Sequence, residues 1–180
     1  MAWIDLSRTI TSGMAVYPGD PEVNLEQTAD HQSDGCQLTR LSMGSHTGTH
    51  LDAPRHYLAN GMTVERLDLN QLITPAYIAS CRPGPDGLLD LTSLDLSGMK
   101  PGDALLLATG WEEKWGAEDY FSGSPQFAEG SSRRIIKLGI NLLGVDLPTV
   151  SEKRQSCDLM AMHRELLGYG ILLIENLVNL

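Results

Sequence analysis

Three short apolar runs in the second half of the chain place the strongest constraint on its fold. They lie at residues 103–108, 141–146 and 171–174, and each is dominated by aliphatic side chains. Uninterrupted apolar runs of this length are typical of strands buried on both faces and are too short for helices. Helical spacing occurs between them, at 131–138 and 157–167. This alternation predicts an α/β or α+β fold in which 171–174 is a central strand.

The residues at the ends of the two helical segments support these boundaries. Ser131 or Ser132 is placed to cap the first helix, because a serine hydroxyl can accept a hydrogen bond from a free backbone N–H. Gly139 and Gly168 are placed to end the two helices. Glycine readily adopts the left-handed conformation that is common just after a helix.

Strand and turn signals dominate the N-terminal half. Partial alternation of apolar and polar residues over the first ten positions predicts an N-terminal strand. The other segments predicted from the sequence are strands at 37–43 and 76–80, turns at 17–21 and 83–87, and a short helix followed by a long surface loop within 111–130. We see no internal repeat or linker, so we expect one domain over residues 1–180.

Composition argues against several classes of function. Lys and Arg number 13 against 23 Asp and Glu, and the formal net charge is -10, whereas nucleic-acid binding needs clustered cations. No run approaches the roughly 20 apolar residues of a membrane span, and the N-terminus lacks a signal-peptide pattern. Cys36, Cys81 and Cys157 are odd in number and scattered, which favours free thiols in a reducing compartment. We therefore expect a cytoplasmic protein that binds neither nucleic acid nor membrane.

Three of the five histidines fall within eleven positions, at His46, His50 and His56, with Asp52 among them. The glycines and proline around them disfavour a helix. In an extended chain His46, His50 and Asp52 share one side, and the last two lie about 6.6 Å apart. His46 and His50 would be roughly 13 Å apart, too far for one ion with bonds of about 2.1 Å. The chain must therefore bend between them, and Gly48 at the midpoint can adopt unusual backbone angles.

These residue types suit a divalent metal ion. Imidazole and carboxylate groups bind Zn²⁺, Mn²⁺ and Fe²⁺, and three protein ligands leave positions for water or substrate, which is typical of catalytic sites. The alternative is that the histidines are hydrogen-bonded turn residues, as is usual for a lone histidine. His56 lies beyond Pro54 and is a candidate general acid or base. Its alternative role is a supporting hydrogen bond to the site.

Residues 46–56 resemble the H-x-G-T-H-x-D-x-P-x-H signature of the cyclase-like metal hydrolases, the family that includes bacterial kynurenine formamidase and isatin hydrolase. The resemblance extends along nearly the whole chain. Residues 17–20 are similar to the family's aromatic-Pro-Gly-Asp turn, 109–111 to its T-G-W and 144–146 to its G-[IV]-D strand. Because the chain ends at Leu180, we expect a terminal strand of longer relatives to be missing.

The resemblance implies a swivelling β/β/α-type fold with a mixed central sheet, a homodimer or higher homo-oligomer, and one or two divalent ions per chain, Zn²⁺ or Mn²⁺. By similarity, His46, His50 and Asp52 would bind a first ion. His163 and Glu175 resemble the family's distal histidine and glutamate. Asp52 and Glu175 would bridge to a second ion, which His163 would also hold.

The implied reaction is hydrolysis of an amide C–N bond by metal-activated water, with His56 taking the water's proton and delivering it to the departing nitrogen. N-formylkynurenine, which would give kynurenine and formate, is the substrate expected first, and a cyclic amide or ester such as isatin is the alternative. Two positions depart from the kynurenine formamidases: Tyr17 replaces a substrate-contacting Trp, and Asn176 replaces a Gly after Glu175. Substrate selectivity is therefore expected to depend on Tyr17.

Without the resemblance, residue chemistry alone leaves the roles of His163 and Glu175 open. His163 lies among apolar residues at helical spacing, where a hydrogen-bonded core histidine is the usual alternative to a ligand. Glu175 ends an apolar strand, and a carboxylate there is costly to bury without a cationic partner. Trp111 and Trp115 could line a pocket for an aromatic substrate or pack in the core. His31 lies in a polar stretch and is expected at the surface.

Two further functions fit some of the same residues. A non-haem iron oxygenase would use His50, Asp52 and His163 as its two-histidine, one-carboxylate triad, but it gives no role to His46 or Glu175. A non-catalytic metal-binding module would need no general base. Turnover of formyl amides after addition of Zn²⁺ or Mn²⁺, without consumption of oxygen, distinguishes the three functions.

Overall fold

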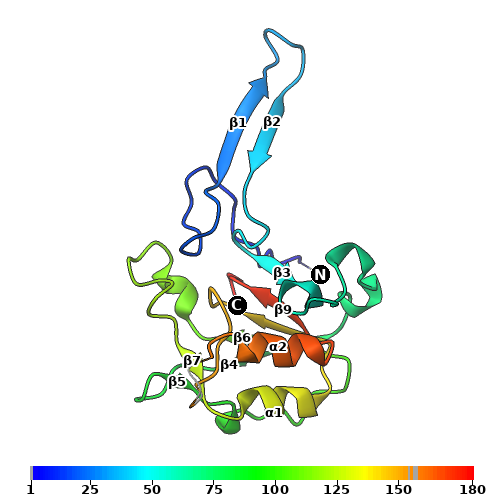
Figure 1. Cartoon of the computed structure of the whole chain (residues 1–180), viewed down its shortest axis with the longest axis vertical. Coiled ribbons are helices and arrows are strands. Elements are labelled where there is room, and N and C mark those ends of the chain that lie inside the picture. The colour runs from blue at the N-terminus through cyan, green and yellow to red at the C-terminus, as the bar shows by residue number, and fades with distance from the viewer. Residues whose placement is uncertain (1, 154, 156–157) are drawn as a thin grey trace.

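The computed structural model describes residues 2–153, 155 and 158–180, and its centre is a five-stranded sheet (Figure 1). The strand order across the sheet is β3 (His50–Asp52), β9 (Leu172–Glu175), β8 (Leu142–Val145), β6 (Ala104–Ala108) and β4 (Ala76–Ser80). β3 runs antiparallel to β9, whereas the other neighbouring strands are parallel. The prediction of an α/β fold with a mixed central sheet is therefore confirmed. Four of these strands match those predicted at 76–80, 103–108, 141–146 and 171–174.

Two helices, α1 (Ser131–Leu138) and α2 (Ala161–Gly168), cover one face of the sheet (Figure 1). The main apolar core lies between these helices and the strands. Its fully buried side chains include Leu105, Leu107, Leu143, Val145, Leu173, Ile135, Met162 and Leu166. Burial of each aliphatic side chain of this kind contributes about 1.5–3 kcal/mol. The uninterrupted apolar runs form strands because both of their faces are covered.

The start of α1 differs from the sequence prediction. Its N-cap is Gly130, and no side chain at that position caps it. The predicted serine cap is wrong. The Ser132 backbone N–H donates to the buried Glu152 carboxylate at 3.1 Å, and its hydroxyl donates to Glu165 Oε2 at 2.6 Å, with Glu152 Oε2 farther away at 3.2 Å. A carboxylate distant in the sequence thus satisfies the free N–H of the first turn. The helix ends at Leu138, and Gly139 follows in the left-handed conformation, as predicted.

The start of α2 also differs from the sequence prediction. The apolar spacing predicts a helix from Cys157, but the structure begins it at Ala161. Asp158 accepts a hydrogen bond from the backbone N–H of Met160 at 3.2 Å, a local turn that competes with the helix. Cys157 itself lies outside the described residues. The end at Gly168 agrees with the prediction.

The opposite face of the sheet carries a smaller apolar cluster, against which Leu6 of the N-terminal segment packs. The N-terminal strand predicted for the first ten residues is wrong, because residues 2–10 are assigned to no strand. Among the described backbone groups, this segment makes one bond to another backbone group, from Val178 N–H to Leu6 O at 3.0 Å. The Arg8 N–H donates instead to the Thr49 hydroxyl at 2.8 Å. A strand needs a repeated ladder of backbone pairs, which alternation within one segment does not supply.

β1 (Asn24–Ala29) and β2 (Leu38–Ser42) form an antiparallel two-stranded arm that projects away from the central sheet (Figure 1). We refer to residues 24–42 as the arm. β2 confirms the strand predicted at 37–43. β1 was missed by sequence reasoning, because most of its side chains are polar and both faces of the arm are largely exposed.

Short elements connect the larger ones. β5 (Leu88–Leu89) pairs in parallel with β7 (Gln126–Phe127). Single 3-10 turns occur at Pro54–His56, Val64–Arg66, Leu69–Gln71, Leu91–Ser93 and Trp111–Lys114. The last of these begins the segment predicted as a short helix and a long loop. No helix in the described part of the chain has the length and apolar character needed to cross a membrane.

Candidate metal centre

A tight turn at Gly48 brings His46 and His50 to the same edge of the sheet. Gly48 has a φ of 60°, which lies in the left-handed region that L side chains rarely adopt. A Cβ added here would also lie 2.8 Å from Ile10 Cδ1. The bend expected between the two histidines is therefore present. It leads directly into β3, where His50 pairs with Glu175 of β9.

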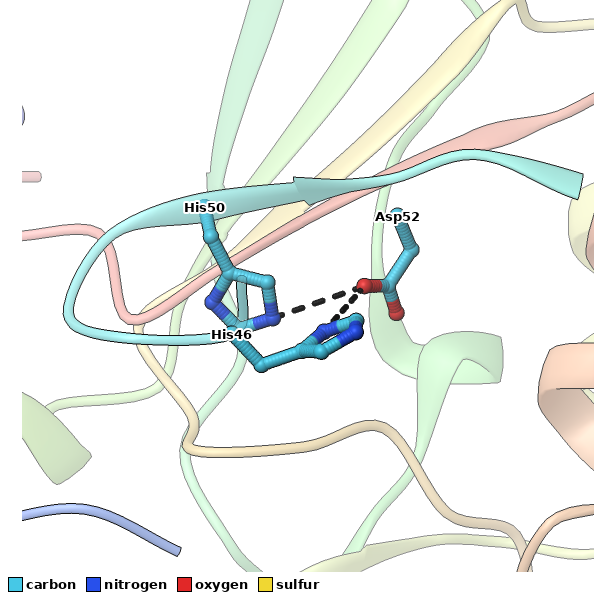
Figure 2. Close-up of side chains that lie close together, drawn as sticks. All are labelled: His46, His50 and Asp52. Atoms are coloured by element: carbon cyan, nitrogen blue, oxygen red, sulfur yellow. Dashed lines mark ion pairs between the residues drawn. The ribbon is translucent and has the colours of Figure 1, made fainter. Parts of the chain in front are cut away.

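His46, His50 and Asp52 converge on one point, and Figure 2 shows both rings beside the same carboxylate. Asp52 Oδ1 lies 2.9 Å from His46 Nδ1 and 3.4 Å from His50 Nε2. Asp52 and His50 are nearly buried, whereas the His46 side chain keeps 27% of its surface exposed. Two imidazoles and a carboxylate in this arrangement could hold one metal ion and leave one side of it accessible. We refer to these three residues as the first ligand group.

The His50 ring presents a defined nitrogen to this point. Its Nδ1 lies 3.0 Å from the Gly48 carbonyl oxygen, which can only accept a hydrogen bond. Nδ1 therefore carries a proton, and Nε2 is the nitrogen that faces Asp52. Orientation of the ring by a backbone carbonyl is a common feature of metal-binding histidines.

Asp52, His163 and Glu175 form a second group, in which all three residues are buried and their ligand atoms lie within 4.8 Å of one another. His163 Nε2 lies 3.2 Å from Glu175 Oε1 and 3.8 Å from Asp52 Oδ2. Glu175 Oε1 also accepts the Val150 N–H at 2.8 Å, which fixes its carboxylate. Because Asp52 directs Oδ1 to the first group and Oδ2 to the second, its carboxylate lies where a bridging ligand would lie.

The buried polar atoms of these groups fit a bound cation. Within the described residues, His50 Nε2 and both Asp52 oxygens make no hydrogen bond of normal geometry, although ring nitrogens approach closely. Burial alone would raise the pKa of Asp52, but the His46 and His50 rings hold it well below its usual range. Burial also works to lower the pKa of His50, but Asp52 and Glu175 overcome it and raise that pKa. The groups thus favour positive charge, which a divalent ion could supply.

His56 lies beside the first group. Its ring centroid is 3.9 Å from that of His46 and 6.3 Å from that of His163. Burial lowers the pKa of His56, and the neighbouring imidazoles add to this effect while Asp52 opposes it. The ring is therefore neutral at neutral pH, and a neutral imidazole can accept a proton.

A cavity of about 380 Å³ opens onto both groups, a size within the usual range for small-molecule sites. Four aromatic side chains line it: Tyr17, Tyr57, Trp115 and Phe121. Tyr17 meets Phe121 edge to face, with ring centroids 5.7 Å apart. Burial, with contributions from Glu175 and other neighbours, raises the pKa of Tyr57 to about 12. Its phenol therefore remains protonated at neutral pH.

The structure brings the predicted site residues together at this cavity. Those that line it are Tyr17, His46, His50, His56, His163 and Glu175, with Asp52 in contact behind them. His31 is exposed, as expected. Sequence reasoning missed Phe121 and Thr149, which lie in irregular segments without a periodic signal. It treated Asn176 only as a departure from the family pattern, although this residue also lines the cavity.

Two of the family-like motifs, at 109–111 and 144–146, meet where β6 and β8 end. The buried Asp146 carboxylate accepts hydrogen bonds from Thr109 N–H, Thr109 Oγ1 and Gly110 N–H at 3.0, 2.6 and 2.7 Å. These bonds fix the turn after β6. Trp111 packs against the main core and donates its Nε1–H to Tyr120 O at 2.9 Å. Of the two tryptophans considered for the pocket, only Trp115 lines the cavity.

Comparison with known proteins decides the family. The sequence matches the family described as "Putative cyclase" over residues 4–152. The chain belongs to this family. A kynurenine formamidase of Bacillus cereus is 32% identical to it over 178 residues, which cover 98% of this chain and 82% of that protein. Family membership agrees with the resemblance carried by residues 46–56.

Two solved structures share the fold. One is described as a potential metal-dependent hydrolase with cyclase activity, and it aligns with a TM-score of 0.72 and 27% identity over 97% of this chain and 80% of that chain. The other is an isatin hydrolase bound to the product analogue thioisatinate, with a TM-score of 0.80 and 20% identity over 98% and 79% of the two chains. The mixed α/β architecture is therefore that of the cyclase-family hydrolases.

Proposed function

We propose that this cyclase-family protein is a metal-dependent hydrolase that cleaves an amide C–N bond, with His56 as its general acid and base. One observation carries the proposal: two ligand groups share the buried Asp52 carboxylate, and their other members line an accessible cavity. The relative named kynurenine formamidase supports the same reaction class.

The two ligand groups would each hold one ion. His46, His50 and Asp52 would hold the first, and Asp52 with His163 and Glu175 would hold the second. We assign these ions as Zn²⁺ or Mn²⁺, because nitrogen and carboxylate donors suit both. When bound, such an ion supplies Lewis acidity, which activates water and stabilises negative charge on a substrate oxygen.

His56 would move the proton of the reaction. Its ring lies against that of His46 and lines the same cavity as the first ligand group. In its neutral form it can accept a proton from the attacking water. Once protonated, it can donate that proton to the departing amide nitrogen.

An aryl formamide, with N-formylkynurenine as the first choice, suits the cavity walls. Tyr17, Trp115 and Phe121 offer aromatic surfaces beside the ligand groups, and aromatic rings pack favourably at edge or offset contacts. Hydrolysis would release formate and kynurenine. A cyclic amide or ester such as isatin offers a ring and a carbonyl to the same walls, and is the second substrate to be tested.

The deciding experiment measures turnover by protein that is stripped of metal and then reloaded with Zn²⁺ or Mn²⁺. We expect formate release from N-formylkynurenine only after reloading, with no oxygen consumed. Opening of isatin in place of formate release would select the cyclic substrate. Oxygen consumption would instead favour the iron oxygenase, and metal binding without turnover of either substrate would favour a binding module.

Self-association in the cytoplasm is a further part of this proposal. The arm exposes Leu41 by 63%, and an isolated two-stranded arm is marginally stable in water. Burial against a second copy of the chain would stabilise it. Cys36 and Cys81 are free thiols, as suits a reducing compartment. Light scattering measures the mass in solution.

A further inference from the structure

We propose that the side-chain amide of Asn176 donates a hydrogen bond to the carbonyl oxygen of the substrate and to the oxyanion formed from it. This inference rests on the proposed amide hydrolysis and adds a substrate-binding residue to it. Asn176 directly follows Glu175, is only 5% exposed, and lines the cavity.

The backbone of Asn176 is held in one conformation. Its φ of 58° lies in the left-handed region, which Asn tolerates better than most residues. Its N–H donates to Leu147 O at 2.9 Å, and its carbonyl accepts the Thr49 hydroxyl at 2.5 Å. Thr49 lies in the turn between His46 and His50, so the same contact ties Asn176 to the first ligand group.

The buried Tyr120 hydroxyl orients the Asn176 side chain. It donates to Asn176 Oδ1 at 2.8 Å. Burial raises the pKa of Tyr120 to about 12, against the opposing effect of the Arg8 guanidinium, so the hydroxyl keeps its proton. Arg8 offers only N–H donors to the phenol oxygen. The hydroxyl proton is therefore left for an acceptor, and the amide must present Oδ1 to Tyr120.

With Oδ1 engaged, the NH₂ group of Asn176 occupies the other side of the planar amide. Among the described residues, no hydrogen bond from Asn176 Nδ2 is present, and this atom is not among the fully buried polar atoms that lack a partner. Its remaining surroundings are those of the cavity that Asn176 lines together with His50 and Glu175. The amide thus offers fixed donors beside the two ligand groups.

A donor fixed in this way assists the proposed reaction. The carbonyl oxygen of an amide gains negative charge as water adds, and a pre-oriented N–H strengthens its hydrogen bond as that charge grows. Because Tyr120 and Thr49 already hold Asn176, the donor needs little reorganisation during the reaction. Loss of this donor is therefore expected to lower kcat more than it raises KM.

The test replaces Asn176 with Gly, which adopts the left-handed conformation without strain. Asn179→Gly is the matched control, because Asn179 is a second left-handed asparagine, with a φ of 59°, and is exposed at the surface. With metal-loaded protein, we expect Asn176→Gly to lower kcat roughly 10²–10³-fold, with little change in KM. Asn179→Gly should keep both values within about 2-fold. Equal kcat values for the two variants would overturn the inference.

A second variant and a spectroscopic measurement test the same role in case Asn176→Gly fails to fold. Asn176→Asp keeps the shape and the oxygen that faces Tyr120 but removes the N–H donors, so it should lose kcat at least as strongly while metal content stays at the wild-type level. In zinc-loaded, ¹⁵N-labelled protein, formate should shift the side-chain amide signals of Asn176 and leave those of Asn179 in place. An active Asn176→Asp variant or an unshifted Asn176 signal would refute the role. Absence of turnover by the wild-type protein would instead count against the proposed function.

Discussion

The arm leads within a few residues into β3, but the arm and the β3–β9 edge hold charge in opposite ways. In the arm, Arg40 and Glu26 pair at 3.2 Å with more than half of each side chain exposed. At the edge, Asp52 and Glu175 are nearly buried, and their described ion pairs are with histidines. An exposed pair contributes about 0–1 kcal/mol, whereas buried carboxylates need a cation. The arm should therefore tolerate loss of charge, and the edge should not.

The largest expected effect on activity comes from replacing Asp52, the carboxylate that both ligand groups share. Asp52→Asn keeps the size of the side chain but removes the charge that serves both ligand groups, so kcat/KM should fall on the order of 10⁴-fold. Metal content, measured by mass spectrometry after dialysis, should fall with it. Glu26→Gln removes the same charge from the arm and should leave both measurements unchanged. Full metal occupancy in Asp52→Asn would show that the carboxylate is not a ligand.

Replacement of His56 should give the next largest effect, and it distinguishes a role in proton transfer from a role in metal binding. His56→Ala should lower kcat about 10²–10³-fold, because the proton acceptor is lost, while metal content stays close to that of the wild type. The assay compares turnover of N-formylkynurenine with metal content in the same preparation. His31→Ala, at an exposed position in the arm, is the control. Simultaneous metal loss in His56→Ala would make this histidine a ligand or its support.

The same contrast explains which elements of the fold could be predicted from the sequence. The strands at 104–108, 142–145 and 172–175 were predicted because their apolar runs are a local signal of burial on both faces. The bend at Gly48 was predicted because His46 and His50 are too far apart in an extended chain to bind one ion. The arm strand at 24–29 was missed, since a polar strand exposed on both faces has no apolar period to detect.

The remaining errors concern partners that are distant in the sequence. Ser132 is a good local cap, but Glu152, twenty positions away, accepts its backbone N–H, and the more distant Glu165 accepts its hydroxyl. Asn176 becomes a candidate donor only through Tyr120, fifty-six positions before it. No property of a single segment contains such contacts. Residue chemistry therefore indicated the ligands, which cluster, but not the groups that orient them.

A smaller effect compares one backbone conformation in the two regions. Gly48 and Gly35 both have positive φ, at 60° and 72°, but a Cβ at Gly48 meets Ile10 whereas one at Gly35 has open space. Gly35→Ala should cost about 1 kcal/mol from strain alone. Gly48→Ala should cost about 2 kcal/mol or more and weaken metal binding, because the turn that aligns His46 and His50 must shift. Denaturant unfolding and metal titration of both variants measure the difference. Equal free energies of unfolding and equal metal affinities would show that the Gly48 turn does not position the histidines.

The smallest effect on chemistry, and the sharpest test of the arm, comes from Leu41→Asp. Leu41 is 63% exposed and pairs with Leu25 across the arm, so a charge there should leave kcat within about 2-fold and the stability of the protomer within about 0.5 kcal/mol. If this face of the arm contacts a second copy, the same charge must be desolvated in the assembly, and light scattering should show a shift towards the protomer mass of 19.6 kDa. Ser42→Asp places the same charge on the opposite face of β2 and should leave the mass unchanged. An unchanged mass in Leu41→Asp would mean that this face of the arm takes no part in assembly. The arm would then bind no partner, whereas the edge would bind metal.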